Sequence, residues 1–217
     1  MPRIPLWGAG ASPAGIEHAA KTLDVYLAFL REPEEVRQQI IDAKAAAGEH
    51  GRELQIGALA SVIVRETEEE ARAHFRQLLE NTGAEVLARS AHEGLIARGV
   101  HPEGLYGISH ANPKIQARID ALKAGRLPTL EDLEFSPGLF SGMTGWGALL
   151  DLTGEGGGTY LVGSAEQVAE RLKWLQSDLG IDTFILSGWP QATEAEYVSE
   201  LLLPLLDLDH EPPVLAH

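Results

Sequence analysis

Short apolar runs alternate along the chain with segments whose apolar residues recur at every third or fourth position. Such runs are typical of strands buried on both faces, and the spacing of the intervening segments is typical of helices. Strands that alternate with helices pair in parallel. The pattern therefore predicts an α/β fold with about four strand–helix units, whose strands lie near Ile4–Trp7, Val25–Phe29, Leu54–Val64 and Thr183–Leu186.

The polar residues that flank these segments predict where the helices begin. Ser12 is followed by a proline, which favours a helix start after the first strand. Thr67 with Glu70, and Ser164 with Gln167, form capping boxes ahead of two later helices. The helix of the second unit is expected to bury one stripe, formed by Val36, Ile40, Ala43 and Ala47.

A long insertion separates the third unit from the last strand. It covers about residues 84–160, far more than an ordinary connection, and its glycine-rich end is Phe140–Gly158. Insertions of this length are commonly lids or binding loops. We expect a single domain over residues 1–217 that carries this insertion.

Composition narrows the classes of partner. With 32 acidic and 17 basic residues the formal net charge is -15, which disfavours nucleic acid and anionic membrane surfaces. The chain has no cysteine and no apolar run long enough to span a bilayer, so a cytoplasmic protein without a membrane anchor is expected. Its histidines lack the spacing of metal ligands, and no metal site is predicted.

Several stretches, in this order, resemble the luciferase-like flavin monooxygenases, most nearly the alkanesulfonate monooxygenase branch. They are Pro5–Ser12, Val62–Thr67, Leu161–Ser164 and Leu179–Gly188. The resemblance implies a (β/α) TIM-barrel fold of which this chain supplies only the carboxyl-terminal half, with strands five to eight.

Four strands alone leave two open edges and an uncovered inner face. The half-barrel is therefore expected to be completed, either by a second copy in a homo-oligomer or by a complementary half-barrel chain. A truncated remnant is the third alternative, and the sequence does not choose among them.

The turn after the first strand is the candidate cofactor site. Its free amides at a helix amino terminus suit a phosphate. In the resembled family this turn binds the phosphate of FMN, which implies cofactor-binding roles for Gly10, Ala11 and Ser12. The alternative is that Ser12 only caps the helix. A deazaflavin remains the alternative cofactor, since a phosphate turn does not identify the ring.

The resemblance also points to positions for catalysis, where this chain departs from the alkanesulfonate enzymes. Leu59 and Ser61 replace an arginine and a histidine, Trp189 and Gln191 replace a tyrosine and a histidine, and the lid arginine falls near Gly154. Ser61, Trp189 and Gln191 are the catalytic candidates, with ordinary packing at the barrel rim as the alternative. The substrate is expected to be a small organic molecule other than a simple alkanesulfonate.

The leading hypothesis is a flavin-dependent monooxygenase that takes reduced FMN from a separate flavin reductase and uses oxygen on a small organic substrate. The alternatives are a non-catalytic half-barrel that binds flavin or a partner chain, and a deazaflavin-dependent oxidoreductase.

Overall fold

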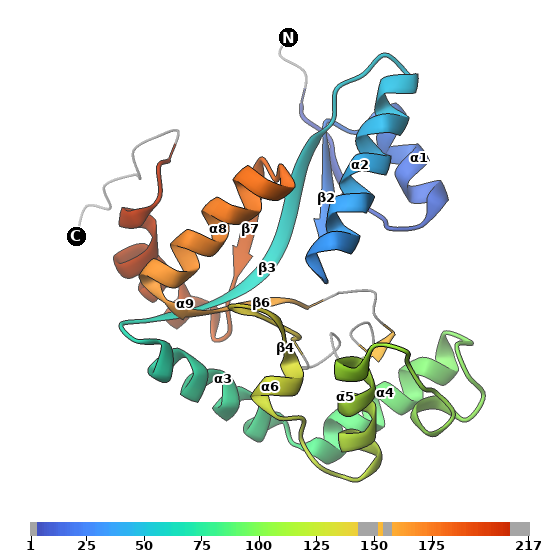
Figure 1. Ribbon diagram of the computed structural model, residues 1–217, viewed down its shortest axis with the longest axis vertical. Coiled ribbons are helices and arrows are strands. Elements are labelled where there is room, and N and C mark those ends of the chain that lie inside the picture. The colour runs from blue at the N-terminus through green and yellow to red at the C-terminus, as the bar shows by residue number, and fades with distance from the viewer. Residues whose placement is uncertain (1–3, 143–151, 154–157, 209–217) are drawn as a thin grey trace.

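The computed structural model describes residues 4–142, 152–153 and 158–208. Four parallel strands form its central sheet in the order β1–β2–β3–β7 (Figure 1). They are β1 (Trp7–Ala9), β2 (Val25–Phe29), β3 (Gln55–Arg65) and β7 (Thr183–Ser187). The predicted α/β fold with four parallel strands is confirmed, and the sheet curls as half of a barrel does.

The helices that lie beside the central sheet begin largely where the polar flanks predict. They are α1 (Pro13–Thr22), α2 (Pro33–Glu49), α8 (Ala165–Leu179) and α9 (Gln191–Tyr197). The Ser12 hydroxyl caps α1, and Ser164 with Gln167 forms the capping box of α8. After α9 the chain continues as a π turn (Val198–Leu202) and a 3-10 turn (Leu203–Leu205). Within the described ranges, no helix is both long and apolar enough to cross a membrane.

The helix of the third unit and the insertion together form a second lobe beneath the sheet (Figure 1). Its helices are α3 (Glu68–Thr82), α4 (Ala84–Ala97), η1 (Gly104–Tyr106), α5 (Pro113–Lys123) and α6 (Leu130–Leu133). Its strands are β4 (Glu134–Ser136), β5 (Leu139–Phe140) and β6 (Tyr160–Ser164). The sequence predicts only short helical pieces here, whereas α4 has 14 residues and α5 has 11. Most of the predicted glycine-rich lid lies outside the described residues.

Two element boundaries differ from the sequence prediction. The first strand is Trp7–Ala9 rather than Ile4–Trp7, because β1 pairs with β2 from Trp7 opposite Val25 onward and β2 does not begin earlier. The last helix, which the sequence predicts over roughly Glu194–Leu203, begins at Gln191 and ends at Tyr197. Pairing register and the turn after β7 set these limits, and neither can be read from hydrophobic periodicity.

Two hydrophobic clusters fill the molecule, and β3 joins them. The first lies between one face of the central sheet and α1, α2 and α8, with Tyr26, Ala28, Ile56 and Ala58 among its buried members. The second lies inside the insertion lobe and includes Ile63, from the far end of β3. Residues Ser61–Arg65 of β3 pair in parallel with β6, so one long strand belongs to both lobes.

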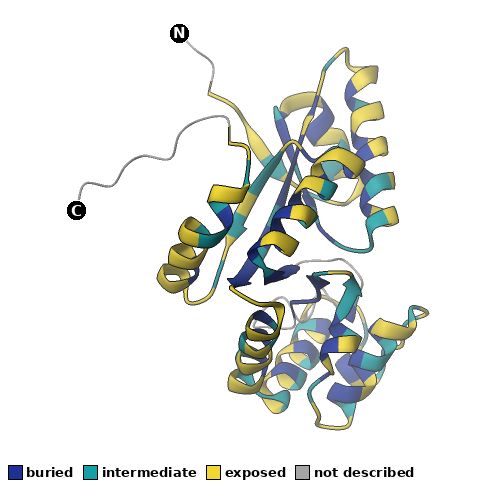
Figure 2. Cartoon of the chain, turned by 60° about the vertical axis from the view of Figure 1, so that its left-hand side comes forward, coloured by how far each residue is buried: buried dark blue, intermediate teal, exposed yellow. Residues whose placement is uncertain are grey.

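The opposite face of the central sheet, here called the open face, lacks such cover. Strand alternation and the pairing register place on it Ala9, the buried Val25 and five other apolar side chains that are not buried: Trp7, Leu27, Phe29, Leu59 and Ile185. None of the five belongs to either core cluster of the described chain. Trp7 is 46% exposed and Ile185 37% exposed, and the strand next to the amino terminus is coloured as exposed in Figure 2.

Candidate functional site

The candidate site lies at the carboxyl-terminal edge of the central sheet. Because the four strands are parallel, the turns after β1, β2 and β7 emerge at this one edge. These turns carry the candidate residues at Gly10–Ser12 and Trp189–Gln191. The fold therefore brings together, at one rim, groups that are far apart in the sequence.

The Gly10–Ser12 turn passes close to the first turn of α1. A side chain at Gly15 would place its Cβ 2.8 Å from the Gly10 carbonyl oxygen, so only glycine allows this approach. The Tyr26 hydroxyl donates to the same carbonyl at 3.0 Å. Burial raises the pKa of Tyr26, so its hydroxyl keeps the proton that it donates.

Both proposed roles of Ser12 are compatible with this geometry. Its Oγ accepts from the Gly15 amide at 3.1 Å, which is the capping role, and its own hydroxyl proton remains available as a donor. Ala11 and Ser12 are exposed. In the described part of the chain, the amides of Ala11, Ser12 and Ala14 have no hydrogen-bond acceptor. The turn thus offers a small set of free donors at a helix amino terminus.

The three catalytic candidates lie at the other side of the rim. The Ser61 hydroxyl is 3.2 Å from that of Ser187, and both project from the open face. Trp189, 65% exposed, and the exposed Gln191 follow directly after β7. Since β1 and β7 are separated by β2 and β3, the turn after β1 and the turn after β7 lie about 14 Å apart along the sheet.

A cavity that sequence reasoning missed opens at the same edge, beyond β2. Its volume is about 240 Å³, and its charged lining includes Arg31, which follows β2, and Arg118, from α5. Glu32 and Glu35 line it too, and Arg31 pairs with Glu35 at 3.4 Å. Cationic side chains are therefore present near the rim. They lie on other elements than β3, which carries the uncharged Leu59 and Ser61.

A buried charge cluster lies beneath the turn after β7. Arg65, the last residue of β3, donates to both carboxylate oxygens of Glu194 at 2.7 and 3.0 Å. The guanidinium also lies 4.0 Å from the centre of the Tyr197 ring. The side chain of Glu194 is 1% exposed and that of Arg65 is 10% exposed. This pair is a fully desolvated, two-point ion pair.

His74, on α3, completes the cluster. Its Nε2 lies 3.2 Å from Glu194 Oε1, although the two are not aligned as a hydrogen bond. Burial, followed by the charge of Arg65, lowers the pKa of His74, while Glu194 and the main chain of Trp189 act in the opposite sense. The imidazole is accordingly neutral near pH 7.

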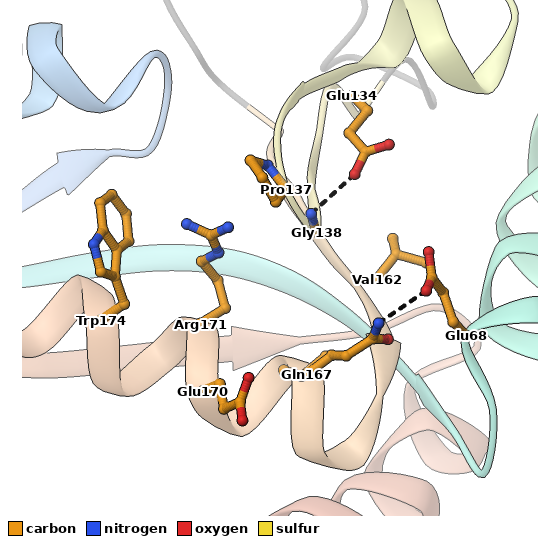
Figure 3. A pocket seen from close by; sticks show the side chains of 10 residues that line it. Glu68, Glu134, Pro137, Gly138, Val162, Gln167, Glu170, Arg171 and Trp174 are labelled. Carbon is orange, nitrogen blue, oxygen red and sulfur yellow. Dashed lines mark hydrogen bonds between the residues drawn. The ribbon is translucent and has the colours of Figure 1, made fainter.

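A second cavity, of about 480 Å³, lies between α8 and the turn that joins β4 to β5 (Figure 3). Arg171 lies over the Trp174 ring at 4.8 Å, and burial lowers its pKa. Three carboxylates also line this cavity, from Glu68, Glu134 and Glu170. The acidic lining does not suit an anionic cofactor, so we assign the cavity no part in the candidate site.

The histidines of the insertion have local roles. His101 Nδ1 accepts from the Glu103 amide at 3.1 Å, and His110 Nδ1 accepts from the Asn112 amide at 3.0 Å. Within the described ranges, no group of three or more metal-ligating side chains comes together.

A family model described as luciferase-like monooxygenase matches residues 1–183 of the 217. The chain belongs to the luciferase-like monooxygenase family. The sequence prediction of this family is confirmed, while the alkanesulfonate branch within it stays a prediction. The correspondence of β1, β2, β3 and β7 to strands five to eight of a luciferase-like barrel stays a prediction.

Solved structures with the same fold are considerably longer than this luciferase-like chain. DmoA from Hyphomicrobium sulfonivorans is 22% identical with a TM-score of 0.61, over 91% of this chain and 40% of its own. Riboflavin lyase (RcaE), solved with modified FMN and riboflavin, is 20% identical with a TM-score of 0.63, over 92% and 42%. The coenzyme F420-dependent tetrahydromethanopterin reductase from Methanopyrus kandleri is 14% identical with a TM-score of 0.51, over 93% and 50%. The chain thus spans half or less of their length.

The charge cluster and the cavity beyond β2, which two arginines and two glutamates line, are the features that the luciferase-like sequence did not reveal. One signal was present for the cluster, since Arg65 ends an otherwise apolar run and a charge there requires a buried partner. Nothing marked Glu194 as that partner, because it lies among other acidic residues in a segment that reads as a solvated helix.

Proposed function

We propose that this chain is part of a flavin-dependent monooxygenase that binds FMN through the turn after β1. The observation that carries the proposal is the set of free amides at Ala11, Ser12 and Ala14, held open by the contact of Gly10 with Gly15. Three amides and a hydroxyl at a helix amino terminus match the acceptors of a phosphate monoester. On a chain of net charge -15, a phosphate requires such a local site.

The remaining rim residues supply contacts for the ring and the substrate. Trp189 offers an exposed aromatic face for stacking, Gln191 an amide, and Ser61 with Ser187 a pair of hydroxyl groups. When bound, the reduced flavin supplies electrons for the activation of oxygen. The residues of this chain then orient the ring and a small organic substrate at the rim.

We further propose that the open face is completed by four more parallel strands. Five apolar side chains stay outside both cores, and β1 and β7 each have one strand neighbour in the described chain. The strands can come from a second copy or from a complementary half-barrel chain, and either source closes the barrel and removes both edges. Reduced FMN is expected from a separate flavin reductase.

A titration with matched ligands tests the flavin site. FMN and riboflavin differ only in the phosphate, so FMN is expected to bind more tightly to the purified chain, as followed by flavin fluorescence. Equal affinity for the two ligands excludes the phosphate turn, and no binding of either excludes a flavin site in the chain alone. Light scattering on the same samples gives the oligomeric state with and without FMN.

A deazaflavin is the second candidate cofactor. One solved structure with this fold is of a coenzyme F420-dependent reductase, and free amides at the turn would bind the phosphate of either cofactor without identifying its ring. Competition between FMN and a deazaflavin phosphate distinguishes the two rings.

A non-catalytic flavin-binding half-barrel is the second candidate function. The positions Leu59 and Ser61 on β3 carry no charge to stabilise a developing anion. Tight FMN binding without substrate-dependent consumption of oxygen, measured with a flavin reductase present, favours this function.

A further inference from the structure

The turn after β7 rests directly on the side chain of Glu194. A Cβ at Gly188 would lie 2.3 Å from Glu194 Cβ, so the turn approaches the carboxylate stem as closely as glycine permits. The Glu194 amide also donates to the Pro190 carbonyl at 3.0 Å. The backbone on both sides of Trp189 is thus tied to one acidic residue.

Glu194 is in turn fixed from the core side. Arg65 binds both of its carboxylate oxygens, and the Arg65 Nη1 also donates to the Val64 carbonyl at 2.6 Å. With the Tyr197 ring 4.0 Å from the guanidinium, Arg65 has little rotational freedom. The carboxylate therefore has a defined position relative to β3.

His74 joins the same group from a third element. Its Nε2 lies 3.2 Å from Glu194 Oε1, and the main chain of Trp189 acts to raise the pKa of the imidazole. The cluster consequently links the end of β3, the helix α3 and the turn after β7.

We propose that Arg65, Glu194 and His74 form a positioning network that sets the orientation of Trp189 at the rim. The three residues do not contact substrate in this role. They act through the main chain of the turn, which holds the exposed indole in one orientation. The value of that orientation to a ligand rests on the proposed function, but the network itself can be tested without any ligand.

An ordinary buried ion pair is the competing explanation, and the two explanations predict different effects on the local order of Trp189. Such a pair contributes to global stability without any specific effect on Trp189. A positioning network changes the local order of Trp189 even in variants that remain folded. The test must therefore read out the turn separately from overall unfolding.

The experiment uses the full chain with Trp7, Trp146 and Trp174 replaced by phenylalanine, which leaves Trp189 as the only tryptophan. Time-resolved fluorescence anisotropy reports the local motion of Trp189. Hydrogen exchange by NMR reports the amide of residue 194, which is bonded to Pro190. Thermal unfolding of each variant confirms that it is folded at the working temperature.

Two variants perturb the network mildly. Glu194→Gln keeps the side-chain shape and removes the charge, and His74→Phe keeps a ring and removes both nitrogens. The control is Arg72→Met, on the same helix α3. It breaks the 3.1 Å ion pair between Arg72 and Glu134, and neither of these residues belongs to the network. Rescue of the His74→Phe effect by His74→Gln is an additional expectation, because Gln restores a polar side chain beside Glu194.

In both network variants the fast component of the Trp189 anisotropy is expected to grow. The amide at residue 194 is expected to exchange about fivefold faster, which corresponds to the loss of one ordinary hydrogen bond. The control is expected to change neither signal. Unchanged signals in both network variants, or equal changes in the control, overturn the proposal. A chain that fails to bind FMN leaves this outcome untouched, so the two proposals fail separately.

Discussion

The ion pair between Arg65 and Glu194 predicts a large asymmetry between breaking it and replacing it. Glu194→Ala leaves a guanidinium of which only 10% is exposed without its carboxylate. Breaking such a buried pair costs about 3–5 kcal/mol, a large part of an ordinary stability of about 5–15 kcal/mol. With a urea dependence of about 2 kcal/mol per molar, the unfolding midpoint falls by about 2 M.

The double variant Arg65→Met/Glu194→Leu removes both charges and fills a similar volume. Its free energy of unfolding is expected to lie close to that of the parent, since the desolvation cost disappears together with the attraction. Urea unfolding followed by circular dichroism and fluorescence measures both variants. Asp178→Ala, which breaks the exposed pair with Arg37, is the control and should leave the midpoint in place because water screens that pair. If the free energy of unfolding of Glu194→Ala lies within about 1 kcal/mol of that of the parent, the reasoning is wrong.

Three further predictions concern the rim and the open face. Ser12→Gly is expected to lower stability by only a few tenths of a kcal/mol and Ser12→Ala by about 1 kcal/mol. Both should weaken the binding of FMN but not of riboflavin, and equal weakening of both ligands contradicts a phosphate contact. Because the pKa of His74 is lowered from 6.5 on folding, the unfolded chain binds the proton first. Stability should therefore fall as the pH drops below about 6.5, before the carboxylates titrate. His74→Gln should flatten this part of a urea-midpoint profile, and an unchanged slope argues against the assignment. Ile185→Lys on the open face should change stability by no more than about 0.5 kcal/mol yet abolish association in light scattering, and undiminished association shows that the open face is not the interface.

The sequence by itself determined the local structure and the family. Hydrophobic runs such as Val25–Phe29 identified strands, and the capping boxes at Thr67 and Ser164 marked where α3 and α8 begin. These features depend on neighbouring residues alone, so their physics is complete within one short segment. The order of the motifs identified the luciferase-like family, and the fold class followed from the alternation of strands and helices.

Only the tertiary structure decided which distant residues meet. Arg65 and Glu194 are 129 positions apart, and Ser61 and Ser187 are 126 apart. Their contacts depend on parallel pairing of β7 with β3 in one register, and a shift by one residue would turn Ser61 and Ser187 to the other face. The open face has the same origin. A residue such as Ile185 reads as buried in any apolar run, and only the arrangement of the strands shows that the described chain leaves it uncovered.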